Sequence, residues 1–315
     1  MSVKENLVRV INHNCPDHVP YHNEGGLVRV THGIVNRPQG AGGLDSWGAG
    51  WGFKDPRLGS YPQTPAINSP ADIRHYKPPD PEAPGLMDAA REILDDADKE
   101  QNLTVAWNAF NLFERSWILL GMDNLLCAVL TDRDKLKPLY RVLADIFIVL
   151  TERFAELGIE IMHYGDDWGT QDRLFMDPEL WRELIKPELA RMYAAAKKNG
   201  MYIFQHTDGC IQDIAGDLVE LGCDRIDPCQ PLANDLGMIK SKYGGRLAFS
   251  GAVDSQHVLS LGTPDDVEAE VKTRIEQLGA GGGYFCGPSH HVPFPEENVE
   301  AMIRATKKYG KYTYN

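Results

Sequence analysis

The sequence lacks the features that would assign it to several large protein classes. Its six cysteines include no Cys-x-x-Cys pair, which excludes a zinc-ribbon type of structural site. No apolar run is long enough to span a bilayer, and the N-terminal MSVKENLVRV shows no signal-peptide pattern. Basic residues are fewer than acidic ones: the chain has 32 Lys and Arg and 45 Asp and Glu, which gives a net charge of −13. These absences predict a cytoplasmic protein that binds neither nucleic acid nor membrane.

The first part of the chain is rich in glycine and then in proline. Residues 25–59 are rich in glycine, with Trp47 and Trp51 among them, and residues 61–84 are rich in proline. We expect an irregular loop or lid region at residues 25–85. Two interpretations stay open: the region binds a ligand, or it is a surface excursion whose aromatic side chains pack against the body.

After about residue 100 the pattern alternates between short apolar runs and amphipathic helices, which is typical of parallel α/β folds. The expected strands are residues 19–22, 103–107, 159–164, 201–206, 224–227, 247–250 and 283–286. An eighth strand is expected near residues 44–47. No glycine-rich dinucleotide fingerprint follows the first strand, which favours a closed barrel over an open sheet. The prediction is a single (β/α)8 TIM barrel over residues 1–315, with an irregular Gly/Pro-rich N-terminal insertion.

Polar residues follow nearly every expected strand, at the end where barrels build their active sites. His206 and Asp208 are two residues apart on one strand end, so both side chains can reach one metal ion. Cys286 and His290 follow another strand and offer a thiolate and an imidazole, ligands that suit Zn²⁺. The alternative is that His206 and Asp208 form an ordinary hydrogen-bonded pair.

Asp166 and Asp167 are adjacent, so we expect one to face the site as a catalytic group and the other to cap a backbone turn. Asn108 is a further catalytic candidate, and His163 is expected to pack outside the barrel. Aromatic residues near the same rim, together with a histidine after the first strand, are candidates for substrate binding. They are Trp47, Trp51, Trp107, Tyr164, Trp168 and His22.

Several segments of the chain resemble the uroporphyrinogen decarboxylase superfamily. The longest is residues 165–231, beginning GDDWGTQDRLF and ending DRIDPCQP. The others are residues 3–21, 44–53, 61–65, 244–267 and 295–312. The resemblance implies a (β/α)8 barrel and one of two chemistries: metal-free decarboxylation of uroporphyrinogen, or zinc-dependent methyl transfer with a corrinoid protein. The decarboxylases carry an RQAGRY segment after the first strand that binds the porphyrinogen carboxylates. Here that place reads YHNEGG, which argues against a porphyrinogen substrate.

The methyltransferase branch implies a zinc site of the form His-x-Cys with a second cysteine near the C-terminus. His206 matches the histidine, and Asp208 stands where the first cysteine is expected. Cys286 and His290 both lie near the place of the second cysteine, and the choice between them stays open. A carboxylate in place of a thiolate leaves zinc more electrophilic, which favours cleavage of a methyl–oxygen bond.

The resulting hypothesis is a zinc-dependent, O-demethylase-type methyltransferase. It takes a methyl group from a small molecule, with an aryl methyl ether favoured, and passes it to the cobalt of a partner corrinoid protein. The chain has no Asp-x-His-x-x-Gly cobalamin motif of its own. The reverse direction, methyl transfer from the corrinoid to an acceptor, stays open, as does formation of a homodimer.

Two other functions remain as alternatives. One is a metal-free decarboxylase or lyase on a small carboxylated substrate, in which Asp45 or Asp166 protonates a carbanion and His290 assists. The other is a barrel that binds a ligand without turnover. Metal content and activity distinguish these three functions.

Overall fold

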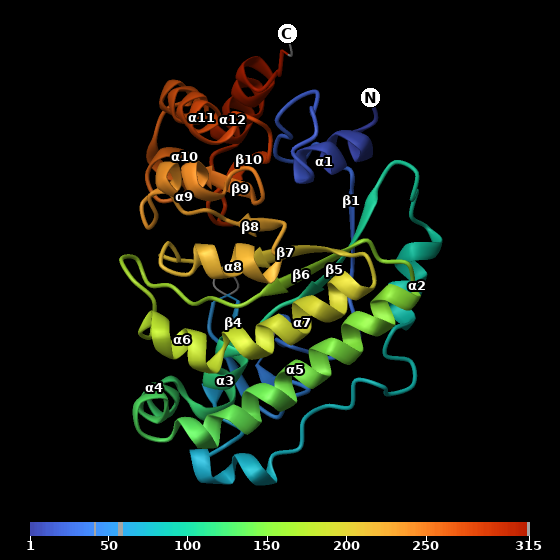
Figure 1. Ribbon diagram of the computed structural model, residues 1–315, viewed down its shortest axis with the longest axis vertical. Helices are drawn as coiled ribbons and strands as arrows, with labels where there is room; N and C mark the ends of the chain where they lie inside the picture. The colour runs from blue at the N-terminus through green and yellow to red at the C-terminus, as the bar shows by residue number, and fades with distance from the viewer. Residues whose placement is uncertain (41, 56–58, 314–315) are drawn as a thin grey trace.

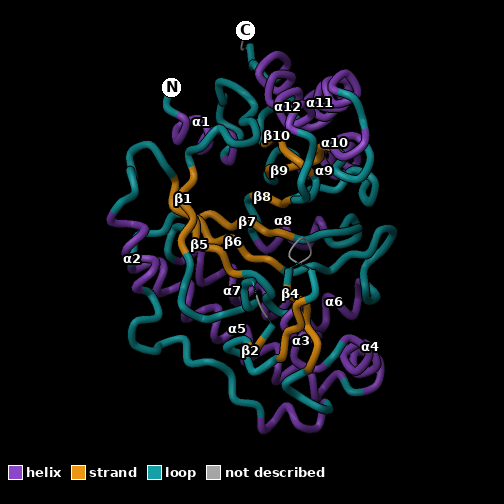
Figure 2. The backbone as a smooth tube through the Cα atoms, turned by 180° about the vertical axis from the view of Figure 1, so that it is seen from behind, coloured by secondary structure: helices purple, strands orange, loops and turns teal. Residues whose placement is uncertain are grey.

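The centre of the protein is a seven-stranded parallel sheet in which the strands lie side by side in chain order. The computed structural model describes residues 1–40, 42–55 and 59–313. The strands are β1 (Leu27–Val30), β5 (Leu103–Asn108), β6 (Ile161–Gly165), β7 (Tyr202–His206), β8 (Arg225–Asp227), β9 (Ala248–Val253) and β10 (Tyr284–Pro288). The sheet curls round (Figure 2), and the architecture is a TIM-barrel-like α/β fold, as predicted.

Helices follow the strands and cover the outer face of the sheet. In Figure 1, α5 and α7 run along the outside of β5 to β7, while α11 and α12 stand beside β9 and β10. The helices before β6 are α1 (Val3–Ile11), the 3₁₀ turn η1 (Pro70–His75), α2 (Asp88–Asp95), α3 (Phe113–Leu120), α4 (Met122–Thr131) and α5 (Arg133–Glu156). The later ones are α6 (Pro178–Leu184), α7 (Lys186–Lys198), α8 (Ala215–Leu221), α9 (Leu236–Tyr243), α10 (Val258–Leu261), α11 (Pro264–Leu278) and α12 (Glu296–Tyr309).

Side chains alternate between the inside of the barrel and the helix layer, as the pleat of a strand requires. At the amino ends of the strands the inward residues form one apolar cluster with α1, which packs across that end. The members from the sheet are Leu103, Val105, Ile161, Phe204, Ala248 and Phe285. The residues between them, such as Met162 and Ile203, belong to the larger core under the helices. These side chains and α1 fill the interior at the amino ends of the strands.

Two of the expected strands are placed differently in the structure. Residues 19–22 do not form a regular strand but lie beside β10, where the Cys286 N–H donates to the Pro20 carbonyl at 2.9 Å. The prediction of a barrel strand near residues 44–47 is wrong, because β2 (Gly43–Leu44) belongs to a separate small sheet. The additional barrel strand is β1, which pairs with β5. Within the described part of the chain, no backbone ladder joins β1 to β10.

The Gly/Pro-rich insertion folds against α3 through buried polar contacts. Its antiparallel sheet contains β2, β3 (Gly50–Phe53) and β4 (Ser60–Thr64). Asp45 and Arg115 form an ion pair at 2.8 Å with both side chains fully buried. Residues 41 and 56–58 of the insertion lie outside the described residues. Trp47 and Trp51 of the insertion are buried; Trp47 packs against Phe147 and Trp51 against Ile118.

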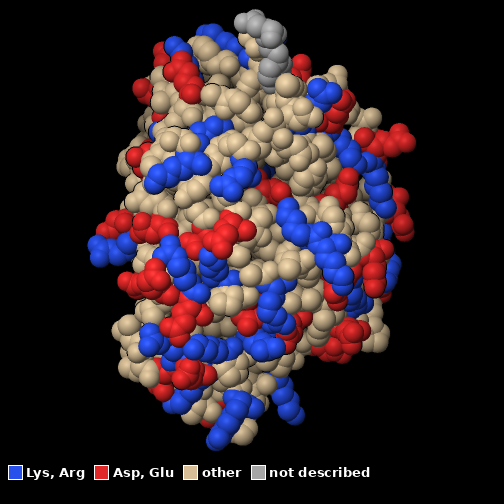
Figure 3. Space-filling view, viewed as in Figure 1, with Lys and Arg blue, Asp and Glu red and all other residues tan. Residues whose placement is uncertain are grey.

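The surface carries both signs of charge. Acidic and basic side chains are interspersed over the face shown in Figure 3. Among the described residues, no helix combines the length and the apolar character needed to cross a membrane.

Candidate active site

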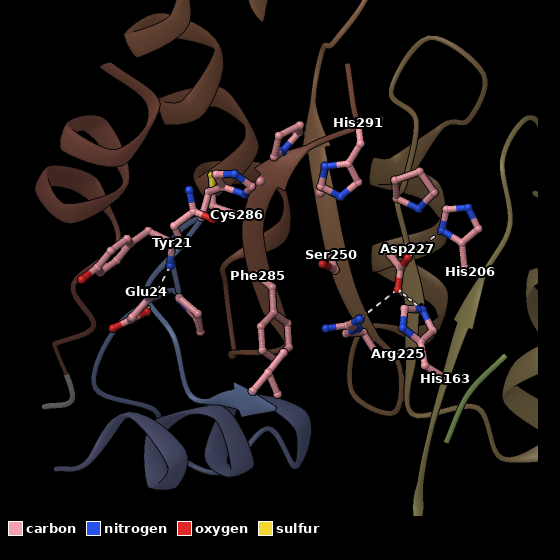
Figure 4. Close-up of a pocket in the computed structure, with 18 of the residues that line it drawn as sticks. Tyr21, Glu24, His163, His206, Arg225, Asp227, Ser250, Phe285, Cys286 and His291 are labelled. Atoms are coloured by element: carbon pink, nitrogen blue, oxygen red, sulfur yellow. Dashed lines mark hydrogen bonds and ion pairs between the residues drawn. The ribbon is translucent and has the colours of Figure 1, made fainter. Parts of the chain in front are cut away.

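A cavity of about 580 Å³ lies inside the barrel and opens where the strands end. Its lining comes from α1, β1, β5 to β10 and the irregular segments at residues 20–25 and 290–291. The size is that of a pocket for a small molecule. Figure 4 shows its polar side, where His163, His206 and Arg225 converge on Asp227. These four side chains come from β6, β7 and β8, so neighbouring strands build the site.

Asp227 is the anchor of this cluster. One carboxylate oxygen lies 2.9 Å from His206 Nδ1, and the other lies 2.9 Å from Arg225 Nη2 and 3.0 Å from His163 Nε2. Burial works against the charge of Asp227, yet His163, Arg225 and His206 outweigh it and hold the pKa of the carboxyl well below its usual range. Asp227 is therefore a fixed anion that orients His206.

Strand alternation brings His163 into this cluster. His163, Phe204, His206, Arg225 and Asp227 occupy inward positions on three paired strands. The expectation that His163 packs outside the barrel is therefore wrong. Burial lowers the pKa of His163 to about 4, so its imidazole is neutral at pH 7 and contributes shape and a hydrogen-bonding nitrogen.

A second cluster lies on the outer side of His206. One ligand atom from each of Asp167, His206 and Asp208 lies within 4.8 Å of the others. The Asp208 N–H donates to Asp167 Oδ1 at 2.9 Å, and His290 Nδ1 lies 3.4 Å from Asp208 Oδ2. The structure thus brings together His206, Asp208 and His290 of the predicted metal ligands and adds Asp167, one of the predicted catalytic pair.

The two imidazole nitrogens of His206 face opposite carboxylates. Nδ1 is bound to Asp227, and Nε2 is directed toward Asp167 at 3.7 Å. Burial alone would lower the pKa of His206, but the bond to Asp227 and the charges of Asp167 and Asp208 raise it to about 9. In the absence of a metal, His206 is therefore a cation that neutralises part of the acidic cluster. A divalent cation at Nε2 would serve the same purpose with more charge.

Close backbone packing between two loops holds Asp167 and Asp208 together. The Cys210 N–H donates to the Thr170 carbonyl at 2.7 Å, which ties the loop after β7 to the loop after β6. A Cβ atom on Gly169 would lie 2.5 Å from the Cys210 nitrogen, and Gly209 has a φ of +82°. Only glycine allows this approach at both positions.

Cys286, the remaining predicted ligand, does not reach either cluster. On β10 the inward residue is Phe285, so Cys286 faces the helix layer, where its thiol contacts Tyr284 and Thr306. Figure 4 places Cys286 across the cavity from His206. Burial raises the pKa of the Cys286 thiol to about 11, which disfavours the thiolate that a metal requires.

Asp166 and Asn108 lie outside the cavity. Asp166 is buried, accepts the backbone N–H groups of Phe113 and Glu114 at 2.9 and 2.7 Å, and so caps the start of α3. Of the adjacent pair, Asp166 is the capping residue and Asp167 the one near the site. Asn108 is buried against His32, whose Nε2 lies 2.9 Å from the Asn108 carbonyl oxygen. Asp45, paired with Arg115, is equally remote, so the lyase alternative finds neither of its proposed acids in the cavity.

Two of the six predicted substrate-binding residues line the cavity, Trp107 and His22. The Trp107 ring lies 4.2 Å from the His163 ring and 5.7 Å from the His206 ring, measured between centroids. The other four are buried in the helix layer or in the insertion, with at most 4% of their surface exposed. They are Trp47, Trp51, Tyr164 and Trp168.

Sequence reasoning assigned no role to Arg225, Asp227 or Arg29, all of which line the cavity. Arg225 and Asp227 are separated by one residue on an expected strand, which is the spacing that had pointed to His206 and Asp208. The same rule of alternation would have found them, had the register of the strand been known.

A curled parallel sheet with charged groups from successive strand ends defines a TIM-barrel-like protein with a cavity inside the barrel. The sequence profile described as uroporphyrinogen decarboxylase (URO-D) matches residues 44–309, and the chain belongs to this family. No protein with curated function matches the sequence.

Among solved structures, the fold is similar to that of a methyltransferase from Methanosarcina mazei. The two share 17% sequence identity over 98% of this chain and 99% of the other, with a TM-score of 0.72. A 3-keto-D-glucoside 4-epimerase from E. coli is similar at 14% identity over 78% of this chain and 100% of that one, with a TM-score of 0.43. The first likeness establishes a shared fold along almost the whole chain.

Proposed function

We propose that the protein is a methyltransferase that moves a methyl group between a small methylated molecule and the cobalt of a separate corrinoid protein. The observation that carries this proposal is the cluster of Asp167, His206, Asp208 and His290 beside a cavity of small-molecule size. Family membership and the fold shared with the Methanosarcina mazei methyltransferase support it.

The donor atoms of this cluster fit zinc. His206 and Asp208 are the first two ligands, and Asp167 or His290 completes the set, since imidazole nitrogen and carboxylate oxygen are both accepted by Zn²⁺. The bond from Asp227 to Nδ1 fixes the ring so that Nε2 faces the cluster, an arrangement typical of zinc-bound histidines. Sulfur is absent from this set, because Cys286 faces the helices.

Zinc bound here would act as a Lewis acid that makes the oxygen of a methyl ether a better leaving group. A set with carboxylates in place of thiolates suits this task, because less charge is donated to the metal. That chemistry favours an aryl methyl ether as the methyl donor. The reverse direction, in which a small acceptor takes the methyl group, uses the same residues.

The chain itself holds the small molecule in place. Trp107 offers an aromatic surface next to His206, and Leu7, Leu27 and Phe285 line the apolar part of the cavity. Arg225 lies over the Phe204 ring at 3.6 Å and binds Asp227, so the groups behind His206 are locked by packing as well as charge. Rigid support of this kind keeps the reacting group near the site.

Metal analysis of the purified protein and its variants tests the zinc assignment. We expect about one zinc per chain in the wild type, loss of zinc in His206→Ala and Asp208→Ala, and retention in Cys286→Ala. His75→Ala, which removes an exposed histidine, is the matched control. Retention of zinc in Asp208→Ala together with its loss in Cys286→Ala would show that the ligand set is wrong.

The reaction is tested with methoxylated phenols and a reduced corrinoid protein, by following methylcobamide formation in the visible spectrum. Activity in the wild type and the His75→Ala control, and its loss in His206→Ala, would support the proposal. A zinc-loaded protein that forms no methylcobamide from any ether would refute the favoured direction.

A further inference from the structure

A second arginine faces the barrel cavity from β1. Leu27 and Arg29 share one face of this strand, and both line the cavity. Arg29 is exposed, and its guanidinium carbon lies 5.6 Å from the centroid of the Trp107 ring on the neighbouring strand. The guanidinium is therefore placed over the aromatic surface that we assign to the small molecule.

Arg29 and Arg225 both line the cavity, but only Arg225 has a carboxylate partner among the described residues. Arg225 is buried and bound to Asp227 at 2.9 Å, whereas the described residues give Arg29 no carboxylate within 4.0 Å and no side-chain hydrogen bond. The alternative is that Arg29 is an ordinary solvated arginine on an edge strand, which would account for its exposure but for nothing else. It would not explain why the charge lies inside the cavity against an aromatic ring. Five unused N–H donors in a planar fork match the two oxygens of a carboxylate.

The groups around Arg29 leave it as the main positive charge on this wall. His22 and His291 lie near it with their ring centroids 6.3 Å apart. Burial lowers the pKa of His22, so the His22 ring is neutral at pH 7. Arg225 also lines the cavity and lies over the Phe285 ring, but it is bound to Asp227. An anion entering beside the apolar residues Leu7, Leu27 and Phe285 would therefore find Arg29 as the arginine without a carboxylate partner.

Trp107 connects the two ends of the cavity. Its ring contacts the Arg29 guanidinium on one side and the His206 imidazole on the other, at 5.6 and 5.7 Å between centres. A planar molecule lying along the indole would have one end at the guanidinium and the other near His206 and Asp208.

We infer that the small molecule is an aromatic carboxylate, held by Arg29 at its carboxylate end, with the methyl-bearing group at the opposite end of the ring. This inference rests on the proposed function for the role of the second end, and it names the substrate class of the same site. Trp107 then stacks on the ring, and Arg29 is the residue that selects an acid over a neutral analogue.

The test compares 4-methoxybenzoate with its neutral analogue 4-methoxybenzamide, by calorimetry on the full chain. We expect the wild type to bind the benzoate at least about 10-fold more tightly than the amide, because a guanidinium–carboxylate pair adds charged hydrogen bonds. Arg29→Gln should abolish this preference, and Arg29→Lys should keep part of it. Arg246→Gln, which removes an exposed arginine from the loop before β9, should match the wild type.

Each result decides a separate point. Equal binding of acid and amide by the wild type, an unchanged preference in Arg29→Gln, or no binding of either probe would overturn the inference. A preference that depends on Arg29, without methyl transfer from any ether, would uphold the inference and overturn the proposed function. Methyl transfer from neutral ethers at the same rate as from acids, unaffected by Arg29→Gln, would uphold the proposed function and overturn the inference.

Discussion

The ion pair between Asp45 and Arg115 predicts how firmly the insertion is held to the barrel. Arg115 Nη1 lies 2.8 Å from Asp45 Oδ2, and neither side chain is exposed. Asp45 also accepts the Trp51 indole N–H at 3.0 Å and the backbone N–H groups of Trp47 and Ala49 at 3.0 and 2.8 Å. The change we consider is Asp45→Asn, which keeps the shape but removes the charge.

The expected cost follows from what the substitution leaves behind. Arg115 would remain buried with its charge unpaired, and breaking a buried pair in this way costs about 3–5 kcal/mol. That is a large part of a typical unfolding free energy of about 5–15 kcal/mol. Replacing both residues, as in Asp45→Asn with Arg115→Met, removes the unpaired charge. We therefore expect the double variant to lose less stability than the sum of the single variants, by about 2 kcal/mol.

Urea unfolding measures this directly, followed by circular dichroism and by the fluorescence of the six tryptophans, two of which, Trp47 and Trp51, lie in the insertion. A loss below about 1 kcal/mol for Asp45→Asn would refute the reasoning, as would additive costs in the double variant. Ligand binding in the folded single variants should stay unchanged, since the pair does not line the cavity.

Three further predictions concern other parts of the chain. Gly209→Ala should destabilise the protein by about 2 kcal/mol or more in urea unfolding, because its positive φ and the neighbouring backbone leave no room for a Cβ; a change within about 0.5 kcal/mol would contradict this. Burial would raise the pKa of Asp217, but its bonds to Arg182 and Lys186 lower it, so its stabilisation is present above about pH 4 and is lost as the pH falls further. Asp217→Asn should thus cost about 1–2 kcal/mol at pH 7, allowing for the partial exposure of Arg182, and progressively less as the pH is lowered below about 4, as measured by unfolding over that pH range. Cys286 should react with iodoacetamide at pH 8 more than about 100-fold more slowly than the exposed thiols, judged by peptide mass analysis, and equal rates would place it outside the core.

The sequence predicted the order of the barrel strands because their hydrophobic runs alternate with well-capped helices. Thr263, for example, forms a complete capping box with Asp266 at the start of α11, a local signal that does not depend on the rest of the fold. β1 was missed because its four residues follow Gly25 and Gly26 and belong, by composition, to the irregular insertion.

The site was harder to predict because strand register decides which residues face inward. Phe285 and Cys286 differ by one position, and that difference places the thiol in the helix layer. His206 and Asp208 were found because a chemically distinctive pair at a strand end needs only local spacing. The partnership of Arg225 and Asp227 with His163 depends on pairing between three strands, which no short stretch of sequence contains.

The missing ladder between β1 and β10 has a consequence for how such a site can diversify. Where strands pair, register fixes the direction of every side chain, and an insertion of one residue would reverse them all. The segment at residues 20–25 lines the cavity but follows no ladder, so its length and residue types can change while the barrel keeps its register. The RQAGRY segment of the URO-D decarboxylases stands at this place in the chain. Here the same place reads YHNEGG, which contains no arginine. Exchange of one short loop can therefore alter which ligands enter, without any change in the opposite side of the cavity, where His163, His206 and Arg225 surround Asp227.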